Sequence, residues 1–230
     1  MLSDYPAANL FETIPHFHDT PSRYEALKKA VKDNLSGRLQ SVKNELSFAL
    51  DREMDASKLV DLAAEDRIPM RVTHNDTKIN NVLFDSITNE AICVIDLDTI
   101  MPGLSLYDFG DSIRSGAVTS DENEQDLDKY GLDIALFKSY TEGFLSEAGH
   151  ALNDEEIANL AFSAKLMTLE CGVRFLTDYL NGDTYFKTDY PEHNLVRCRT
   201  QFKLVEDIEK HLDEMNACVD EIYRRSLIEG

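Results

Sequence analysis

Residues 71–85 read RVTHNDTKINNVLFD, a segment in which a cluster of polar side chains stands directly before an apolar run. His74, Asp76, Lys78 and Asn81 follow one another at short spacing, and the apolar residues after them predict a strand. A polar turn at the start of a hairpin accounts for such a cluster when it stands alone. A catalytic loop is the alternative, and the sequence further along the chain favours it.

A β-hairpin is predicted around this segment. Two short apolar runs, at residues 81–84 and 91–95, are joined by a polar turn. Because a hairpin brings its two ends together, the carboxylate after the second run, Asp96, is expected to lie near Asp76 and Asn81. A convergence of three polar side chains is harder to explain as an ordinary turn.

These side-chain types suit phosphoryl transfer from ATP. A carboxylate must receive the proton of the acceptor hydroxyl, and hard oxygen ligands must hold the Mg²⁺ that bridges the phosphates. Asp76 suits the first task. The Asn81 amide oxygen and the Asp96 carboxylate suit the second, with Asp98 as a further ligand. We therefore predict a site for ATP and Mg²⁺ in which Asp76 is the catalytic base.

Composition limits the other functions that the chain can have. Acidic residues outnumber basic ones 43 to 23, and the net charge of −20 disfavours binding to nucleic-acid backbones or anionic lipid. The four cysteines form no CxxC pair, and no apolar stretch approaches the ~18 residues of a membrane span. We expect a soluble cytoplasmic protein with reduced thiols, bound neither to nucleic acid nor to a membrane.

Helices are predicted on both sides of the hairpin, in one mainly α domain of residues 1–230. We expect residues 1–70 to be a helical lead-in and residues 71–111 to carry the catalytic and metal loops. Residues 112–230 are then a helical region on the substrate side.

Two helix starts can be predicted in detail. Thr20 is expected to cap the first helix, with Pro21 at its first position. Asn153 and Glu156 form a capping box, which we expect to begin one long helix that Gly182 ends.

Longer motifs resemble a known family. HNDTKINN, residues 74–81, matches the catalytic loop of protein-kinase-like folds, and VIDLD, residues 94–98, resembles the metal loop of the aminoglycoside phosphotransferase and choline kinase superfamily. The likeness extends from about Leu10 to Leu212. Three stretches resemble N-acetylhexosamine 1-kinases within that superfamily: ETIPHFHDTP (12–21), IDLDTIMPGLSLYDFGDSIR (95–114) and GVRFLTDYLNGDTYFK (172–187).

The resemblance implies the larger, C-terminal lobe of a protein-kinase-like fold. It also implies phosphorylation of the anomeric hydroxyl of an N-acetylhexosamine with ATP and Mg²⁺. By the same resemblance Lys78 faces the transferred phosphate, His74 supports the catalytic loop, and Arg174 and Tyr185 line the sugar pocket. For Arg174 the alternative is an ion pair with a surface acid.

A literal DFG at residues 108–110 is interpreted as a coincidence. The metal aspartate of a protein kinase comes just after the strand that follows the catalytic hairpin, and Asp96 occupies that place. The resemblance implies instead that Asp108 is a structural residue that braces the catalytic loop. A DxD metal site of a nucleotide-sugar glycosyltransferase is a further alternative for Asp96 and Asp98, but the helical pattern upstream does not suit its Rossmann-like half.

Two other patterns are interpreted as structural. His16 and His18 lack a second pair of metal ligands and are predicted to be ordinary loop histidines. The acidic residues 121–128 lack the mid-loop glycine of a calcium loop and are predicted to form a solvated surface.

The sequence lacks parts that a complete kinase needs. Gly37 is the one glycine before Thr73, so no glycine-rich phosphate loop precedes the catalytic segment, and no strand lysine is recognisable there. We therefore expect the N-terminal lobe to be absent. The alternative function is a non-catalytic binding or partner protein, or one half of a split kinase that binds a separate N-lobe chain. Exposed apolar surface and dimer formation are expected to accompany it.

Overall fold

The computed structural model describes residues 5–229 of the 230. This part is mostly helical, and its strands form two antiparallel pairs plus an isolated bridge between Val118 and Leu132. The helices are α1 (Thr20–Asp33), α2 (Lys43–Leu50), α3 (Lys58–Ala64), α4 (Ser105–Gly116), α5 (Ile134–Ala148), α6 (Asp154–Ala158), α7 (Leu160–Asn181) and α8 (His193–Glu229). The strands are β1 (Arg71–Thr73), β2 (Val82–Phe84), β3 (Ala91–Val94) and β4 (Met101–Gly103).

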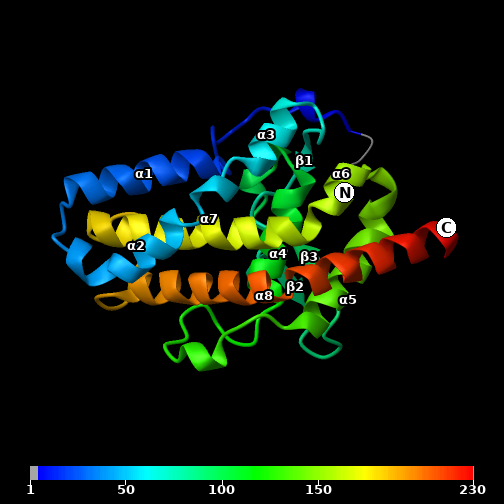
Figure 1. Cartoon of the computed structure of the whole chain (residues 1–230). Helices are drawn as coiled ribbons and strands as arrows, with labels where there is room; N and C mark the ends of the chain where they lie inside the picture. The colour runs from blue at the N-terminus through cyan, green and yellow to red at the C-terminus, as the bar shows by residue number, and fades with distance from the viewer. Residues whose placement is uncertain (1–4, 230) are drawn as a thin grey trace.

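Helix α7 is the centre of the fold and lies between α1 and α8 (Figure 1). Its first half packs with α4, α5 and α8 in one apolar cluster, and its second half packs with α1, α2 and α8 in another. A helix that is apolar on nearly all sides is stable only when neighbours cover it, and here they do. None of the helices in residues 5–229 is long and apolar enough to cross a membrane.

Close packing of α4 on α7 depends on Gly110. A Cβ atom at this position would overlap the Ser163 carbonyl oxygen and the Met167 side chain of α7. We expect Gly110→Ala to lower the free energy of unfolding by about 1–3 kcal/mol, because α4 must move away from α7. Urea denaturation measures this. Gly116→Ala in the same helix is the control, since a Cβ there meets no atom within 4 Å. Equal stability of the two variants would contradict the close approach of the helices.

The predicted hairpin is confirmed as the antiparallel pair β2–β3, with Val82 opposite Val94. A second pair, β1–β4, was not predicted, and in it Thr73 lies opposite Met101. Proline and glycine weaken strand signals, and β4 contains both, Pro102 and Gly103. The β1–β4 pair matters for the candidate site because the segment 74–81, called the catalytic loop after its predicted role, begins where β1 ends.

The capping predictions need two corrections. The N-cap of α1 is Asp19 rather than Thr20, because the Asp19 carboxylate accepts the Ser22 N–H at 3.1 Å. The Thr20 hydroxyl is turned inward instead and donates to the buried Glu170 at 2.6 Å. Pro21 lies in the first turn of α1, as expected.

The capping box at Asn153 and Glu156 is present, but it begins only the short helix α6. Asn159 separates α6 from α7, since its side chain donates back to the Glu155 carbonyl oxygen at 2.8 Å and its backbone leaves the helical region. The prediction of a single long helix was therefore wrong. Its predicted end is confirmed: Gly182 terminates α7 with a φ of 92°, a conformation that suits glycine.

Candidate active site

The catalytic loop connects β1 to β2 and is tied to the far end of the hairpin. Ile95 donates its N–H to the Asn81 carbonyl oxygen at 2.9 Å. The His74 Nε2 atom lies 3.1 Å from the Ile95 carbonyl oxygen. Asp96 follows Ile95 directly, so the structure brings the end of β3 to the loop that carries Asp76.

Asp76 is held by two neighbours in the loop. Asn81 Nδ2 donates to the Asp76 carbonyl oxygen at 2.8 Å and to its Oδ2 atom at 3.1 Å. Lys78 Nζ donates to the same Oδ2 atom at 3.1 Å. Among the described residues the Oδ1 atom has no hydrogen-bond partner, and this oxygen is therefore available to accept a proton.

The predicted metal ligands lie at the same edge. Asn81 is buried and uses its amide nitrogen for Asp76, so its amide oxygen is the atom left for a cation. Asp96 is exposed, with a left-handed φ of 62°, and Asp98 is exposed in the 3₁₀ turn Leu97–Thr99. Within residues 5–229 no three His, Cys, Asp or Glu side chains could hold a metal by themselves. The donor set fits Mg²⁺, which is usually held by one or two carboxylates together with phosphates and water.

The brace expected at Asp108 is present. Its Oδ2 atom accepts the His74 N–H at 2.9 Å, and its Oδ1 atom accepts the Asn75 N–H at 2.7 Å. The Thr77 hydroxyl donates to the Asp108 carbonyl oxygen at 2.6 Å. Burial raises the pKa of Asp108 to about 6, against the lowering effect of the two N–H groups. Helix α4 thus fixes the loop on both sides of Asp76.

Residues that the sequence did not single out also shape the loop. Asn75 adopts a left-handed φ of 65°, and its side chain donates to the Thr99 carbonyl oxygen at 3.0 Å. The Thr99 hydroxyl in turn donates to the His74 carbonyl oxygen at 2.7 Å. Asparagine tolerates positive φ better than most residues, which was the one local signal for this role.

His18 is not the ordinary loop histidine that was predicted. Its Nδ1 atom lies 3.0 Å from Glu170 Oε1 in α7, and its Nε2 atom lies 2.8 Å from the Asn75 carbonyl oxygen. The side chain is 6 % exposed. The segment before α1 therefore contacts the catalytic loop directly.

Arg174 and Tyr185 line one cavity of about 340 Å³ beside α1 and α7. The Arg174 guanidinium lies 5.9 Å from the ring centroid of Tyr185 and 5.5 Å from that of Phe186. Among residues 5–229 Arg174 forms no ion pair with a carboxylate, and its role in a sugar pocket stays a prediction. The turn that presents Tyr185 is held by the Asp178 carboxylate, which accepts the Tyr185 N–H at 2.8 Å.

The charges in this cavity are unusual for so acidic a chain. In the described part, every arginine except Arg23 and Arg174 forms an ion pair with a carboxylate. Both exceptions line the same cavity. Arg23 donates to the carbonyl oxygens of His16 and Phe17, at 3.1 and 2.6 Å, and its buried Nε atom has no hydrogen-bond partner among the described residues. The cavity therefore offers guanidinium donors and aromatic rings to a ligand.

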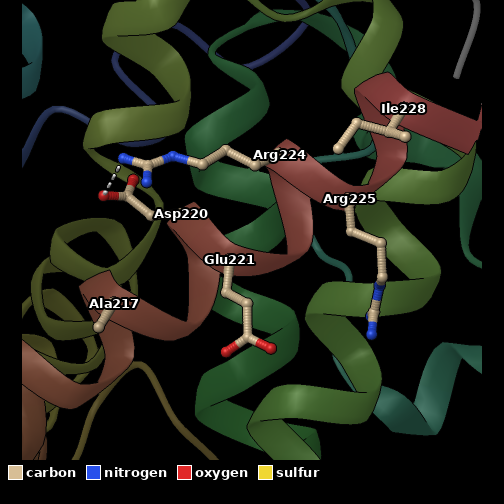
Figure 2. A pocket seen from close by; sticks show the side chains of 6 residues that line it. All are labelled: Ala217, Asp220, Glu221, Arg224, Arg225 and Ile228. Carbon is tan, nitrogen blue, oxygen red and sulfur yellow. Dashed lines mark ion pairs between the residues drawn. The ribbon is translucent and has the colours of Figure 1, made fainter.

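A different hollow lies on the C-terminal part of α8 (Figure 2). Its lining side chains all come from that helix. Arg224 lies 4.0 Å from Asp220, and Arg225 pairs with Glu142 of α5 at 2.8 Å. Because these charges neutralise one another and none of the lining residues belongs to the catalytic loop, the hollow is not part of the candidate site.

Comparison with known families agrees with this geometry. A family model described as the phosphotransferase enzyme family (APH) matches residues 6–138, more than half of the chain. The match includes the catalytic loop, the hairpin and the bracing helix α4, whereas Arg174 and Tyr185 lie beyond it. The chain belongs to the phosphotransferase enzyme family.

Proposed function

We propose that this chain is the C-terminal lobe of a protein-kinase-like phosphotransferase that uses ATP and Mg²⁺ to phosphorylate a hydroxyl of a small molecule. The observation that carries the proposal is the arrangement around Asp76. Its Oδ1 atom has no partner among residues 5–229, while Asn81 and the end of β3 that leads to Asp96 lie beside it. A free carboxylate oxygen next to hard oxygen ligands is what phosphoryl transfer needs.

Each loop residue then has a role. Asp76 accepts the proton of the acceptor hydroxyl as that oxygen attacks the terminal phosphorus of ATP, and the bond from this phosphorus to the bridging oxygen breaks and releases ADP. Lys78, which now pairs with Asp76, is positioned to contact the transferred phosphate, and His74 holds the loop to the end of β3. Asn81 and Asp96 would hold Mg²⁺, which would neutralise the charge of the phosphates.

The acceptor that the cavity supports best is a monosaccharide, and we propose the anomeric hydroxyl of an N-acetylhexosamine. A cavity of about 340 Å³ suits a small ligand. The Arg174 guanidinium can donate to sugar oxygens, and the rings of Tyr185 and Phe186 can pack against the apolar face of the sugar. Two arginines and one carboxylate, Asp178, line the cavity, so its net positive charge favours a neutral sugar over the cation of choline.

The direct test is ADP release from Mg-ATP. The acceptors are N-acetylglucosamine, N-acetylgalactosamine, choline and an aminoglycoside, and Asp76→Asn is the inactive control. Release that requires an N-acetylhexosamine and disappears in the variant is the expected result. Release with another acceptor alone would keep the phosphotransferase and replace its substrate. If no acceptor leads to ADP release, this chain is not an active phosphotransferase on its own.

Asp96→Ala is expected to weaken the binding of Mg-ATP by about 10-fold or more, because a carboxylate ligand of the metal is lost. Isothermal titration with Mg-ATP measures the affinity, and titration with ATP in EDTA shows the part that does not depend on the metal. Asp85→Asn in the turn of the same hairpin is a control for the change in charge. Equal affinity for wild type and Asp96→Ala would exclude Asp96 as a ligand.

A second candidate function rests on the surface of the hairpin. All of β3 is exposed, and Ile92 and Val94 are 63 % and 53 % exposed, with Leu83 and Phe84 of β2 nearly as open. Isolated two-stranded hairpins are marginally stable in water, so this apolar surface favours a covering segment. We propose that such a cover supplies the glycine-rich loop, as in a split kinase. No ADP release by this chain alone, together with release once a separate chain that carries a glycine-rich loop is added, would favour this candidate, whereas self-association alone would show only that a second copy covers the hairpin.

A further inference from the structure

The two ring nitrogens of His18 face two different acceptors. The Asn75 carbonyl oxygen, 2.8 Å from Nε2, can only accept a hydrogen bond, so Nε2 carries a proton. Glu170 Oε1 lies 3.0 Å from Nδ1, and the other oxygen of Glu170 already accepts the Thr20 hydroxyl. A carboxylate in this position favours a proton on Nδ1 as well. The contacts therefore describe an imidazolium that bridges α7 and the catalytic loop.

The surroundings of His18 are mostly acidic. Glu170 faces it from α7, and Asp108 and Asp111 act on it from α4. The Tyr107 ring of α4 lies 4.9 Å from the imidazole, centroid to centroid. Burial alone lowers the pKa of His18, but Glu170 and the Asn75 carbonyl outweigh burial and raise the pKa above its ordinary value.

The pKa of the partner carboxylate, Glu170, is shifted in the opposite direction, below its ordinary value. Glu170 is 1 % exposed, and its burial raises its pKa. The His18 imidazolium, the Thr20 hydroxyl and the charge of Arg174 more than compensate and leave the pKa below its ordinary value. Arg174 lies one helical turn after Glu170, so the same stretch of α7 faces both the loop and the cavity.

We infer that His18 is a positioning residue. Its imidazolium links the backbone at Asn75 to Glu170 and so keeps Asp76 at a fixed position relative to the cavity at Arg174. Its effect on turnover rests on the phosphotransferase function proposed above. Asp76 is the next residue after Asn75, and small displacements of a catalytic group lower rates strongly. The bridge also joins three segments that are far apart in the sequence: the stretch before α1, the catalytic loop and α7.

The bridge has a defined pH dependence. Because the pKa of folded His18 is raised, the imidazolium persists above pH 6.5, and the bridge is lost as the pH rises through the folded value. Loss of the proton leaves Nδ1 as an unprotonated nitrogen opposite a carboxylate. Turnover is then expected to fall on the alkaline side.

The first test uses the wild-type protein and needs no activity. Two-dimensional ¹H–¹⁵N NMR of the imidazole reports protonation at each ring nitrogen, and the amide signals of residues 75–77 report the loop. We expect both nitrogens to be protonated at pH 6.5 and the loop amides to shift with the titration of His18. A neutral ring at that pH would overturn the inference even if the protein is an active kinase. So would amide chemical shifts of residues 75–77 that stay constant while His18 titrates.

The second test separates positioning from mere packing. Glu170→Gln keeps the shape of the side chain but removes its charge, so the alkaline limb of the turnover profile is expected to move to lower pH. His18→Gln retains a donor toward Asn75 and is expected to lose this limb, while His18→Ala lowers turnover about 10- to 100-fold with little change in nucleotide KM. His211→Gln, at an exposed position of α8, is the matched control.

These outcomes are distinct from a failure of the proposed function. If the NMR titration follows the expected course but no acceptor is phosphorylated, the bridge stands and the phosphotransferase proposal fails. If turnover is present but Glu170→Gln lowers it equally at every pH, His18 has only a packing role.

Discussion

Asp76→Asn is expected to lower turnover by about 10²–10⁴-fold while the thermal transition remains within a few degrees of wild type. The asparagine keeps the size of the side chain and an oxygen for the Asn81 amide, so the loop retains one of its contacts. It cannot accept the proton of the acceptor hydroxyl. Single-turnover kinetics measure the chemical step, and circular dichroism on heating measures the fold.

The change in charge needs its own control. Asp128→Asn removes one negative charge from the exposed acidic stretch, where the Asp128 side chain makes no hydrogen bond among the described residues. Its turnover is expected to equal that of wild type. If Asp76→Asn keeps more than a tenth of wild-type turnover, Asp76 is not the base, and the free Oδ1 atom has another explanation.

The parts of the fold that were predicted are those whose signals are local. The hairpin follows from two apolar runs around a polar turn, and the helix end at Gly182 follows from one residue type that tolerates positive φ. The β1–β4 pair escaped prediction because Pro102 and Gly103 obscure it. The break at Asn159 escaped because a capping box marks where a helix begins and says nothing of its length.

The candidate site divides in the same way. Asp76, Lys78 and Asn81 lie within six residues, so their spacing alone predicted a common loop. His18 and Glu170 are 152 positions apart, and no spacing rule connects them. A histidine in a polar segment is most often a surface residue, and only the folded arrangement shows that this one is buried between α7 and the loop.

Asp108→Asn is expected to lower turnover by about 100-fold, because the loop loses half of its brace. One oxygen of the asparagine can still accept a backbone N–H. The amide nitrogen, however, faces the N–H of either His74 or Asn75, and two donors cannot bond to each other. The displaced loop carries Asp76 with it. Asp66→Asn, at an exposed position with positive φ that asparagine tolerates, is the control.

The pH dependence gives Asp108 a second signature. Burial raises its pKa from 3.8 to about 6 in the folded protein. The contribution of Asp108 to stability is therefore complete below pH 3.8 and is lost as the pH rises through about 6, by on the order of 3 kcal/mol. The ionised form is the one that accepts both loop N–H groups. Turnover is thus expected to rise through pH 6 while this share of the stability falls.

Urea denaturation of wild type and Asp108→Asn between pH 4 and 7 isolates the effect, because the other carboxylates titrate alike in both proteins. The difference in unfolding free energy is expected to change across this range and to level off above pH 7. A difference that stays constant from pH 4 to 7 would show that the pKa of Asp108 is not raised. The acid limb of turnover would then have to come from another group, since a brace that stays ionised throughout cannot switch the loop.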